Sequence, residues 1–272
     1  MLRRVCFYGE QRSVTWTHLA STVEAGATKI VVEQEVDWRA GEQIVIAPTS
    51  FTPNEADVAI IKSVSAVDKK TITLEEPLKF RHISAEETAG SHSYSLKAEV
   101  GLLTRNIRIM GEEKALQEEQ AFGGRVIVSE ITVEDKEGKN QIITGSANFS
   151  NVEFYKTGQL GWTDFFDPHY SLVFLDVGDV KKANRKLSTI SKCSFHDSYA
   201  PAVGVFGTNT LKVEKNVAYK TVGSAMVVWG DKNELLDNLI ITNLWPSTFQ
   251  GRKEVNNKME GAIEIGKSPF CF

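Results

Sequence analysis

The carboxylates and the imidazole that are the strongest candidates for catalysis or ligand binding lie in one short stretch that is rich in aromatic residues. The polar members are Asp164, Asp167, His169 and Asp176, and the aromatic residues around them are Trp162, Phe165, Phe166 and Tyr170. Two carboxylates on one face are what acid–base cleavage of a glycosidic bond requires, and carboxylate oxygens also bind Ca²⁺. A long loop whose aspartates form turns has the same composition. We therefore take the four polar residues as candidates for glycan or ligand binding, and we assign no catalytic residue.

Three further residues are candidates for ligand contact, and one is a candidate for modification. His196 and Asp197 follow a strand-like run, where a polar stripe along a repeating structure would hold a polysaccharide. A solvated outer face produces the same pattern. Arg105 offers a guanidinium to an acidic sugar, with a structural ion pair as the alternative. Asn148 begins the triplet Asn-Phe-Ser, which is a glycosylation sequon in a secreted protein.

The composition narrows the classes of partner and cofactor. The 272 residues carry a net charge of −4, and 24% of them are charged and 42% hydrophobic, as in ordinary folded domains. A nucleic-acid partner is not expected, because phosphate binding needs a concentrated basic surface. The three cysteines lack zinc-ligand spacing, and nucleophile and phosphate-loop motifs are absent. We expect no cofactor or metal, with Ca²⁺ as the one open case, and no transmembrane segment in this chain.

Short β-branched runs separated by turn residues dominate, and from about residue 100 they repeat. Four windows start with a polar residue and end with a large apolar one: Asn151–Phe154, Lys192–Phe195, Asn216–Tyr219 and Asn238–Ile241. Their starts are 41, 24 and 22 residues apart, and residues 171–174 would supply a strand inside the first gap. This period, with one short strand per repeat, predicts a solenoid with ladders of stacked Asn side chains. We predict an all-β chain: a right-handed parallel β-helix preceded by a small β region.

Several long motifs resemble one known family. They are Thr15–Thr17, Val36–Ile46, Ala98–Ile107, Glu153–Gln159, Val203–Thr208 and Trp245–Lys253. Together they resemble fibrocystin and fibrocystin-L over nearly the whole chain. The resemblance implies a fragment of the extracellular region of a very large single-pass membrane protein with G8 domains and parallel β-helix repeats. It places the end of a G8-like domain, with Val5–Gly9 as its last strand, and the start of the β-helix in residues 1–97, and further β-helix repeats in residues 98–272.

The resemblance also carries the functional expectation. It implies a cell-surface location within a receptor-like or coat-forming protein, where this module binds a protein or glycan ligand without catalysis. The alternative is a glycan-acting protein that binds or cleaves hyaluronan, since cell-surface hyaluronidases share the arrangement of G8 domain and β-helix more distantly. A fragment with no separate function is the third reading.

Overall fold

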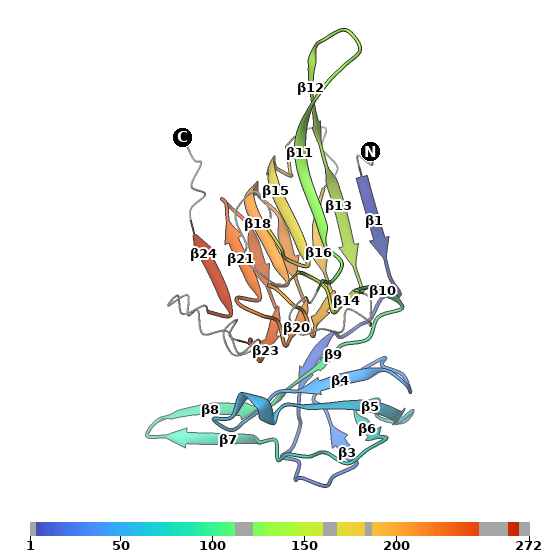
Figure 1. The fold of residues 1–272 in the computed structure, drawn as a ribbon. Helices are drawn as coiled ribbons and strands as arrows, with labels where there is room; N and C mark the ends of the chain where they lie inside the picture. The colour runs from blue at the N-terminus through green and yellow to red at the C-terminus, as the bar shows by residue number, and fades with distance from the viewer. Residues whose placement is uncertain (1–3, 112–121, 160–167, 183–186, 245–260, 267–272) are drawn as a thin grey trace. The chain divides into compact units, whose positions relative to one another are not determined.

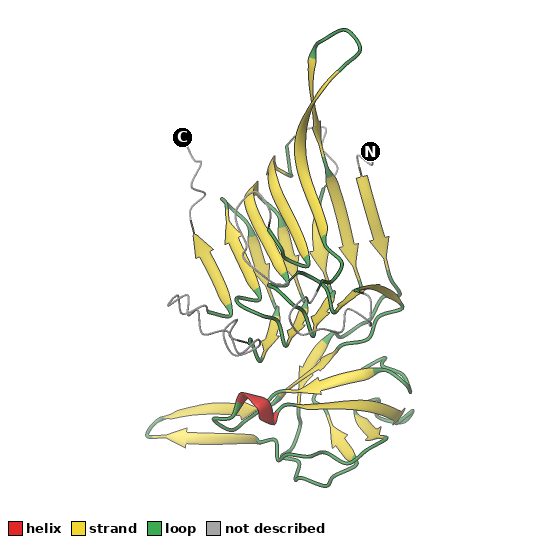
Figure 2. Cartoon of the chain, viewed as in Figure 1, coloured by secondary structure: helices red, strands yellow, loops and turns green. Residues whose placement is uncertain are grey.

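Strands dominate the computed structural model, which describes residues 4–111, 122–159, 168–182, 187–244 and 261–266 (Figure 1, Figure 2). Within those ranges the only helix is a single 3₁₀ turn, η1 (Pro53–Glu55), so the predicted all-β class is confirmed. The chain divides into two units. Residues 11–104 form the antiparallel unit, and residues 1–10 together with 105–272 form the parallel unit.

The antiparallel unit is a six-stranded sheet with a separate hairpin. In spatial order its strands are β2 (Trp16–His18), β9 (Glu99–Leu102), β4 (Gln43–Ile46), β5 (Asp57–Val64), β6 (Thr71–Leu74) and β3 (Lys29–Val31). The hairpin is β7 (Ser84–Ala89) with β8 (His92–Lys97). Alternation along β5 buries Ala59 and Ile61 and exposes Val58 and Ile60. This unit corresponds to the small β region that the sequence predicts.

The parallel unit consists of three sheets. The first sheet contains β1 (Arg4–Tyr8), β13 (Ser146–Ser150), β16 (Thr189–Ser191), β19 (Lys212–Glu214) and β22 (Glu234–Leu236). The second contains β10 (Ile107–Met110), β14 (Val152–Tyr155), β17 (Ser194–His196), β20 (Val217–Tyr219) and β23 (Leu239–Ile241). The third contains β12 (Asn140–Thr144), β11 (Val126–Glu134), β15 (Leu172–Asp179), β18 (Val203–Asn209), β21 (Met226–Trp229) and β24 (Ile263–Gly266). All neighbours are parallel except β11 and β12, which form a hairpin.

Each repeat contributes three strands instead of the single strand expected from the sequence. After β13, β14 and β15, every further triplet adds one strand to each sheet in register. The four sequence windows all fall on the second sheet, where β14, β17, β20 and β23 stack directly. Residues 171–174, expected in the same row, lead into β15 of the third sheet. The alternation of a strand's side chains does not reveal which sheet it joins.

β1 belongs to the parallel unit, where it pairs with β13. The sequence analysis instead placed Val5–Gly9 in the small β region. It also placed the division between the two parts at residue 97, whereas the antiparallel unit ends at Thr104. The reason is packing, because Val5 and Phe7 face the core of the parallel unit and the Phe7 and Phe149 rings stack with centroids 5.6 Å apart. The antiparallel unit is therefore an insertion between β1 and β10. At its base the Glu10 N–H donates to Asn106 Oδ1 at 2.6 Å.

Stacked rows and ladders hold the parallel unit together. In one row of the core the rings of Phe154 and Phe195 stack with centroids 4.6 Å apart. At the neighbouring corner Asn216 Nδ2 donates to Asn238 Oδ1 at 2.9 Å, so the predicted Asn ladder is confirmed. The corners also share a left-handed backbone, with φ between 48° and 54° at Asn151, Lys192, Lys215, Asp237, Lys156, Asp197, Lys220 and Thr242.

Candidate functional site

The second sheet carries a buried charged cluster on the side away from the core. Along β14 the side chain of Phe154 enters the core, so those of Glu153 and Tyr155 point the other way. The register places Arg108 of β10 on one side of Glu153, while His196 of β17 stacks on Tyr155. Glu153 and His196 are nevertheless only 2% and 1% exposed. We call Arg105, Arg108, Glu153, His196 and Asp197 the charge cluster.

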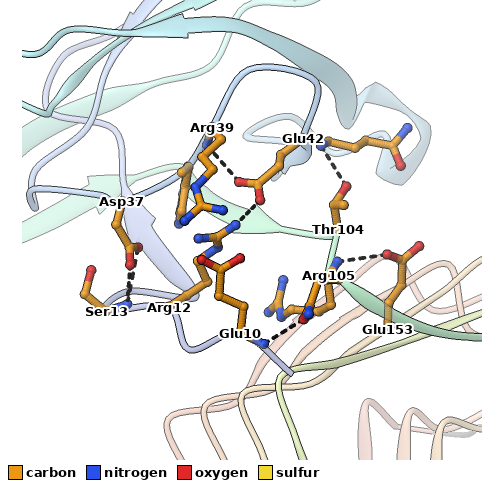
Figure 3. Close-up of polar contacts among 12 residues, drawn as sticks. Glu10, Arg12, Ser13, Asp37, Arg39, Glu42, Thr104, Arg105 and Glu153 are labelled. Atoms are coloured by element: carbon orange, nitrogen blue, oxygen red, sulfur yellow. Dashed lines mark hydrogen bonds and ion pairs between the residues drawn. The ribbon is translucent and has the colours of Figure 1, made fainter. Parts of the chain in front are cut away.

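Both carboxylate oxygens of Glu153 are engaged. Glu153 Oε1 accepts from His196 Nε2 at 3.2 Å and from Arg108 Nε at 2.5 Å. Glu153 Oε2 accepts from the Arg105 N–H at 2.9 Å, as Figure 3 shows. The other ring nitrogen of the histidine, Nδ1, lies 3.0 Å from Asp197 Oδ2. With a carboxylate at each nitrogen, this geometry favours the doubly protonated form of the imidazole, in which both nitrogens donate.

The pKa shifts agree with that geometry. Burial by itself raises the pKa of Glu153, but the hydrogen bonds from His196 and Arg105 and the charges of His196 and Arg108 outweigh it, so the pKa is lowered. Burial by itself lowers the pKa of His196, but hydrogen bonds to Asp197 and Glu153 outweigh it, so the pKa is raised. Each group therefore stabilises the charged form of the other. A carboxylate that already accepts three hydrogen bonds is a poor proton donor or acceptor, and the cluster has the chemistry of a structural ion network.

Three of the residues predicted to contact a ligand, Arg105, His196 and Asp197, belong to the charge cluster. Arg105 is 5% exposed, and its Nε donates to the Lys192 carbonyl oxygen at 2.9 Å. His196 is buried between carboxylates, and the Asp197 side chain is 40% exposed. Of the three, Asp197 alone offers a side chain with substantial exposure to a ligand. Their roles in ligand binding stay predictions.

The aromatic-rich stretch is described only in part. Asp164 and Asp167 lie outside the described residues. His169 is partly buried, and its carbonyl oxygen accepts from the Gln159 N–H at 2.8 Å. Asp176 is exposed at an irregularity in β15 with a φ of 50°. Burial, and then the negative charge of Glu130, raise the pKa of Asp176.

Aromatic rings do gather on the outer face of the third sheet. Tyr170 and Phe206 lie 5.6 Å apart at a tilt of 58°, and Phe206 and Trp229 lie 5.3 Å apart at 84°. Rings tilted against each other in this way pack edge to face. They do not form a flat platform for a sugar ring.

The sequon asparagine is buried. Asn148 is 6% exposed in β13, and its Oδ1 accepts from Thr189 Oγ1 at 2.9 Å. Its Nδ2 faces Cys6 Sγ at 3.9 Å. An amide held between two neighbouring strands leaves little space for a glycan. Glycosylation of Asn148 would therefore require the loss of its hydrogen bond to Thr189.

Sequence reasoning missed Glu153 and Arg108. The repeat could have revealed this pair. Aligning residues 106–109 with residues 151–154 puts Arg108 opposite Glu153, and β10 and β14 pair in that register. The guanidinium of Arg108 also lies 4.4 Å from the ring centroid of Tyr155. The antiparallel unit holds a buried ion pair of its own, Arg12 with Glu42, which Figure 3 shows. It also holds a buried contact of 3.0 Å between His82 Nε2 and Asp57 Oδ2.

Metal and membrane features are few in the described ranges. In those ranges no group of three or more His, Cys, Asp or Glu side chains is placed to hold a metal ion. The same part of the chain includes no helix with the length and apolar character needed to cross a bilayer. Cys6 is an exposed free thiol. Cys193 is buried and free, and burial raises its pKa to about 12.

Comparisons with known proteins agree with this architecture. Residues 138–267 match a family model described as the CEMIP β-helix. Fibrocystin-L of Mus musculus is 35% identical to the chain over 96% of the chain and 6% of its own length. Fibrocystin of Canis lupus familiaris is 29% identical over 99% of the chain and 6% of its own length. A G8 domain-containing protein of Dictyostelium discoideum is 29% identical over 80% of the chain and 16% of its own length.

The chain is thus a relative of the fibrocystin family, and the resemblance inferred from its motifs is confirmed. It spans about 6% of the length of fibrocystin-L and fibrocystin.

Proposed function

We propose that the parallel unit is a right-handed parallel β-helix and that the antiparallel unit is part of a G8-like region. The three in-register sheets and the match to the CEMIP β-helix model support the first assignment. The G8 domain-containing relative supports the second. In this arrangement the β-helix is a stiff scaffold, because each coil is fixed by ladders to the coils on either side.

The proposed role of this scaffold is binding. We infer that the chain is an extracellular module of a receptor-like or coat-forming membrane protein, and that its outer faces hold a protein or glycan ligand without catalysis. The likeness to fibrocystin-L supports the location. The charge cluster carries the argument against catalysis, since its carboxylate and imidazole are already neutralised by one another and by arginine.

Hyaluronan is the probe for this proposal. The folded chain, secreted from mammalian cells, is passed over immobilised high-molecular-weight hyaluronan and over immobilised heparin. Saturable retention of wild type on either glycan, altered in Asp197→Ala and unaltered in Asp231→Ala, supports glycan binding at the second sheet, because both glycans are polyanions and removing a carboxylate at their contact face changes the repulsion. Asp231 is a matched control because it is an exposed aspartate of the same unit. Absence of retention on both glycans removes them as ligands and leaves a protein ligand.

One observation favours the glycan-cleaving alternative. Asp176 is exposed, its pKa is raised, and the carboxylate of Glu130 contributes to that shift. Glycosidases use a pair of carboxyl groups in which the pKa of one is raised. Glu130 also accepts a hydrogen bond from Thr144 Oγ1 at 2.7 Å.

A further inference from the structure

His82 is fully buried in the antiparallel unit, between two acceptor oxygens. Its Nδ1 lies 2.9 Å from the carbonyl oxygen of Ala47, and its Nε2 lies 3.0 Å from Asp57 Oδ2. A carbonyl oxygen and an ionised carboxylate only accept hydrogen bonds, whereas a neutral imidazole has a single N–H to donate. Both contacts are therefore hydrogen bonds only if the site holds one proton more than a neutral ring and an ionised Asp57 carry.

The geometry favours the ring as the holder of that proton. Asp57 already accepts from the Phe80 N–H at 2.9 Å and from the Lys79 N–H at 3.1 Å. With two backbone donors aimed at it, the carboxylate acts as the acceptor at this site. The imidazole is then the group that donates at both nitrogens.

These contacts fasten two separate segments to each other. Ala47 and Asp57 flank the loop of residues 48–56, which connects β4 to β5, and His82 belongs to the segment of residues 79–83, which leads into β7. Next to the ring, the Ile83 N–H donates to Thr49 Oγ1 of the loop at 3.1 Å. We call Ala47, Asp57 and His82 the clasp, because together they hold residues 79–83 against the base of the loop.

Other charges near the clasp are paired elsewhere. In the described part of the chain, the charged side chain in contact with the ring is Asp57, from the start of β5. The backbone of His82 pairs with Val23, and the neighbouring Glu24 lies 3.0 Å from Arg81 in an exposed ion pair. The end of β4 contributes only the carbonyl of Ala47. The proton balance of the clasp is therefore set by His82 and Asp57.

We propose that the clasp is a pH-sensitive fastening, closed while His82 carries a proton on both ring nitrogens and opened on the Ala47 side when the ring loses one of them. The remaining proton stays on Nε2, because an N–H bond to a carboxylate is stronger than one to a neutral carbonyl. Nδ1 then turns a lone pair toward the Ala47 oxygen, and that hydrogen bond is lost. Histidine changes its charge between about pH 5 and pH 8, so residues 79–83 are held in mildly acidic solution and loosened as the pH rises. The device belongs to the antiparallel unit and does not depend on ligand binding by the parallel unit.

The test follows the whole chain by NMR from about pH 5 to about pH 8. We expect the ring nitrogen shifts of His82 to report two protonated nitrogens at the acidic end and Nε2–H alone at the alkaline end. Over the same range the protection factor of the Ile83 amide, which corrects for the intrinsic rise of exchange with pH, should fall about tenfold, the effect of losing one buried hydrogen bond.

Variants separate the clasp from other titrating groups. His82→Gln keeps a donor for Asp57 but does not titrate, so the protection of Ile83 should no longer change with pH. His92→Gln removes an exposed histidine of the same unit and should keep the wild-type fall. Asp57→Asn supplies an amide that can donate to Nε2, so a neutral ring with its proton on Nδ1 satisfies both contacts and the clasp should stay closed at the alkaline end.

Three results would overturn the proposal. One is a His82 ring with a single proton throughout the range, and another is a carboxyl carbon shift that places the proton on Asp57. The third is a fall in Ile83 protection that persists in His82→Gln. Should both clasp variants fail to fold, the titration of the His82 ring in wild type decides alone.

Discussion

Replacing Glu153 by glutamine tests the charge cluster. The change keeps the shape of the side chain, removes its charge and leaves one acceptor oxygen for three donors, from Arg105, Arg108 and His196. Breaking a buried ion pair by removing one partner costs about 3–5 kcal/mol. The Arg108 side chain is 43% exposed, and water can satisfy part of what it loses, so we expect the lower end, about 3 kcal/mol.

The assay combines urea unfolding with local hydrogen exchange. Two units need not unfold together, so amide exchange in β10 and β17 reports on the cluster directly. Glu214→Gln is the matched control: its partner Lys212 lies 2.8 Å away, but both side chains are partly exposed, so its loss should be below about 1 kcal/mol. The reasoning is refuted if Glu153→Gln costs no more than the control, or if exchange in β10 and β17 does not accelerate.

Three further outcomes are expected. The pKa of His196 is raised from 6.5, so its stabilising contribution is complete below pH 6.5 and is lost as the pH rises through the raised value. Urea unfolding should show that decline in wild type, and seeing it unchanged in His196→Gln would assign it to another group. Asn216→Ala should cost about 3 kcal/mol, because it strips buried partners from the Cys193 N–H and the Ile190 carbonyl. Asn238→Ala removes equivalent bonds, to the Asn216 N–H and the Val213 carbonyl, but Asn238 is partly exposed and water can replace part of them, so its loss should be about 1 kcal/mol. Equal losses in thermal unfolding would contradict this reasoning. Mass spectrometry of the chain secreted from mammalian cells should find Asn148 unmodified, and full occupancy would contradict its burial in β13.

The sequence predicted the features that recur. The four polar-to-apolar windows identified β14, β17, β20 and β23 because every repeat places an inward apolar residue at the same position of the stacked strands. The Asn ladder followed from the same spacing. The all-β class followed from short β-branched runs and from the scarcity of helical periodicity.

Features that depend on distant pairing were beyond the sequence. The segment of β1 looks like any short strand, and its partner β13 lies well over a hundred positions later. The three-strand repeat was hidden because β16, β19 and β22 share no window that runs from a polar residue to a large apolar one, unlike the strands of the second sheet. Among candidate site residues, polarity suggested exposure for Arg105 and His196, yet each is buried against a specific partner. Burial of a charge depends on such a partner, which local sequence does not name.

The size of hyaluronan after incubation with the chain tests the central claim, that this is a binding module and not an enzyme. High-molecular-weight hyaluronan is incubated with the folded, secreted chain, with and without Ca²⁺, and its length is followed on a gel. The account predicts no shortening under either condition. Shortening by wild type that is lost in Asp176→Asn and kept in Asp231→Asn would contradict it and make the chain a glycan-cleaving enzyme.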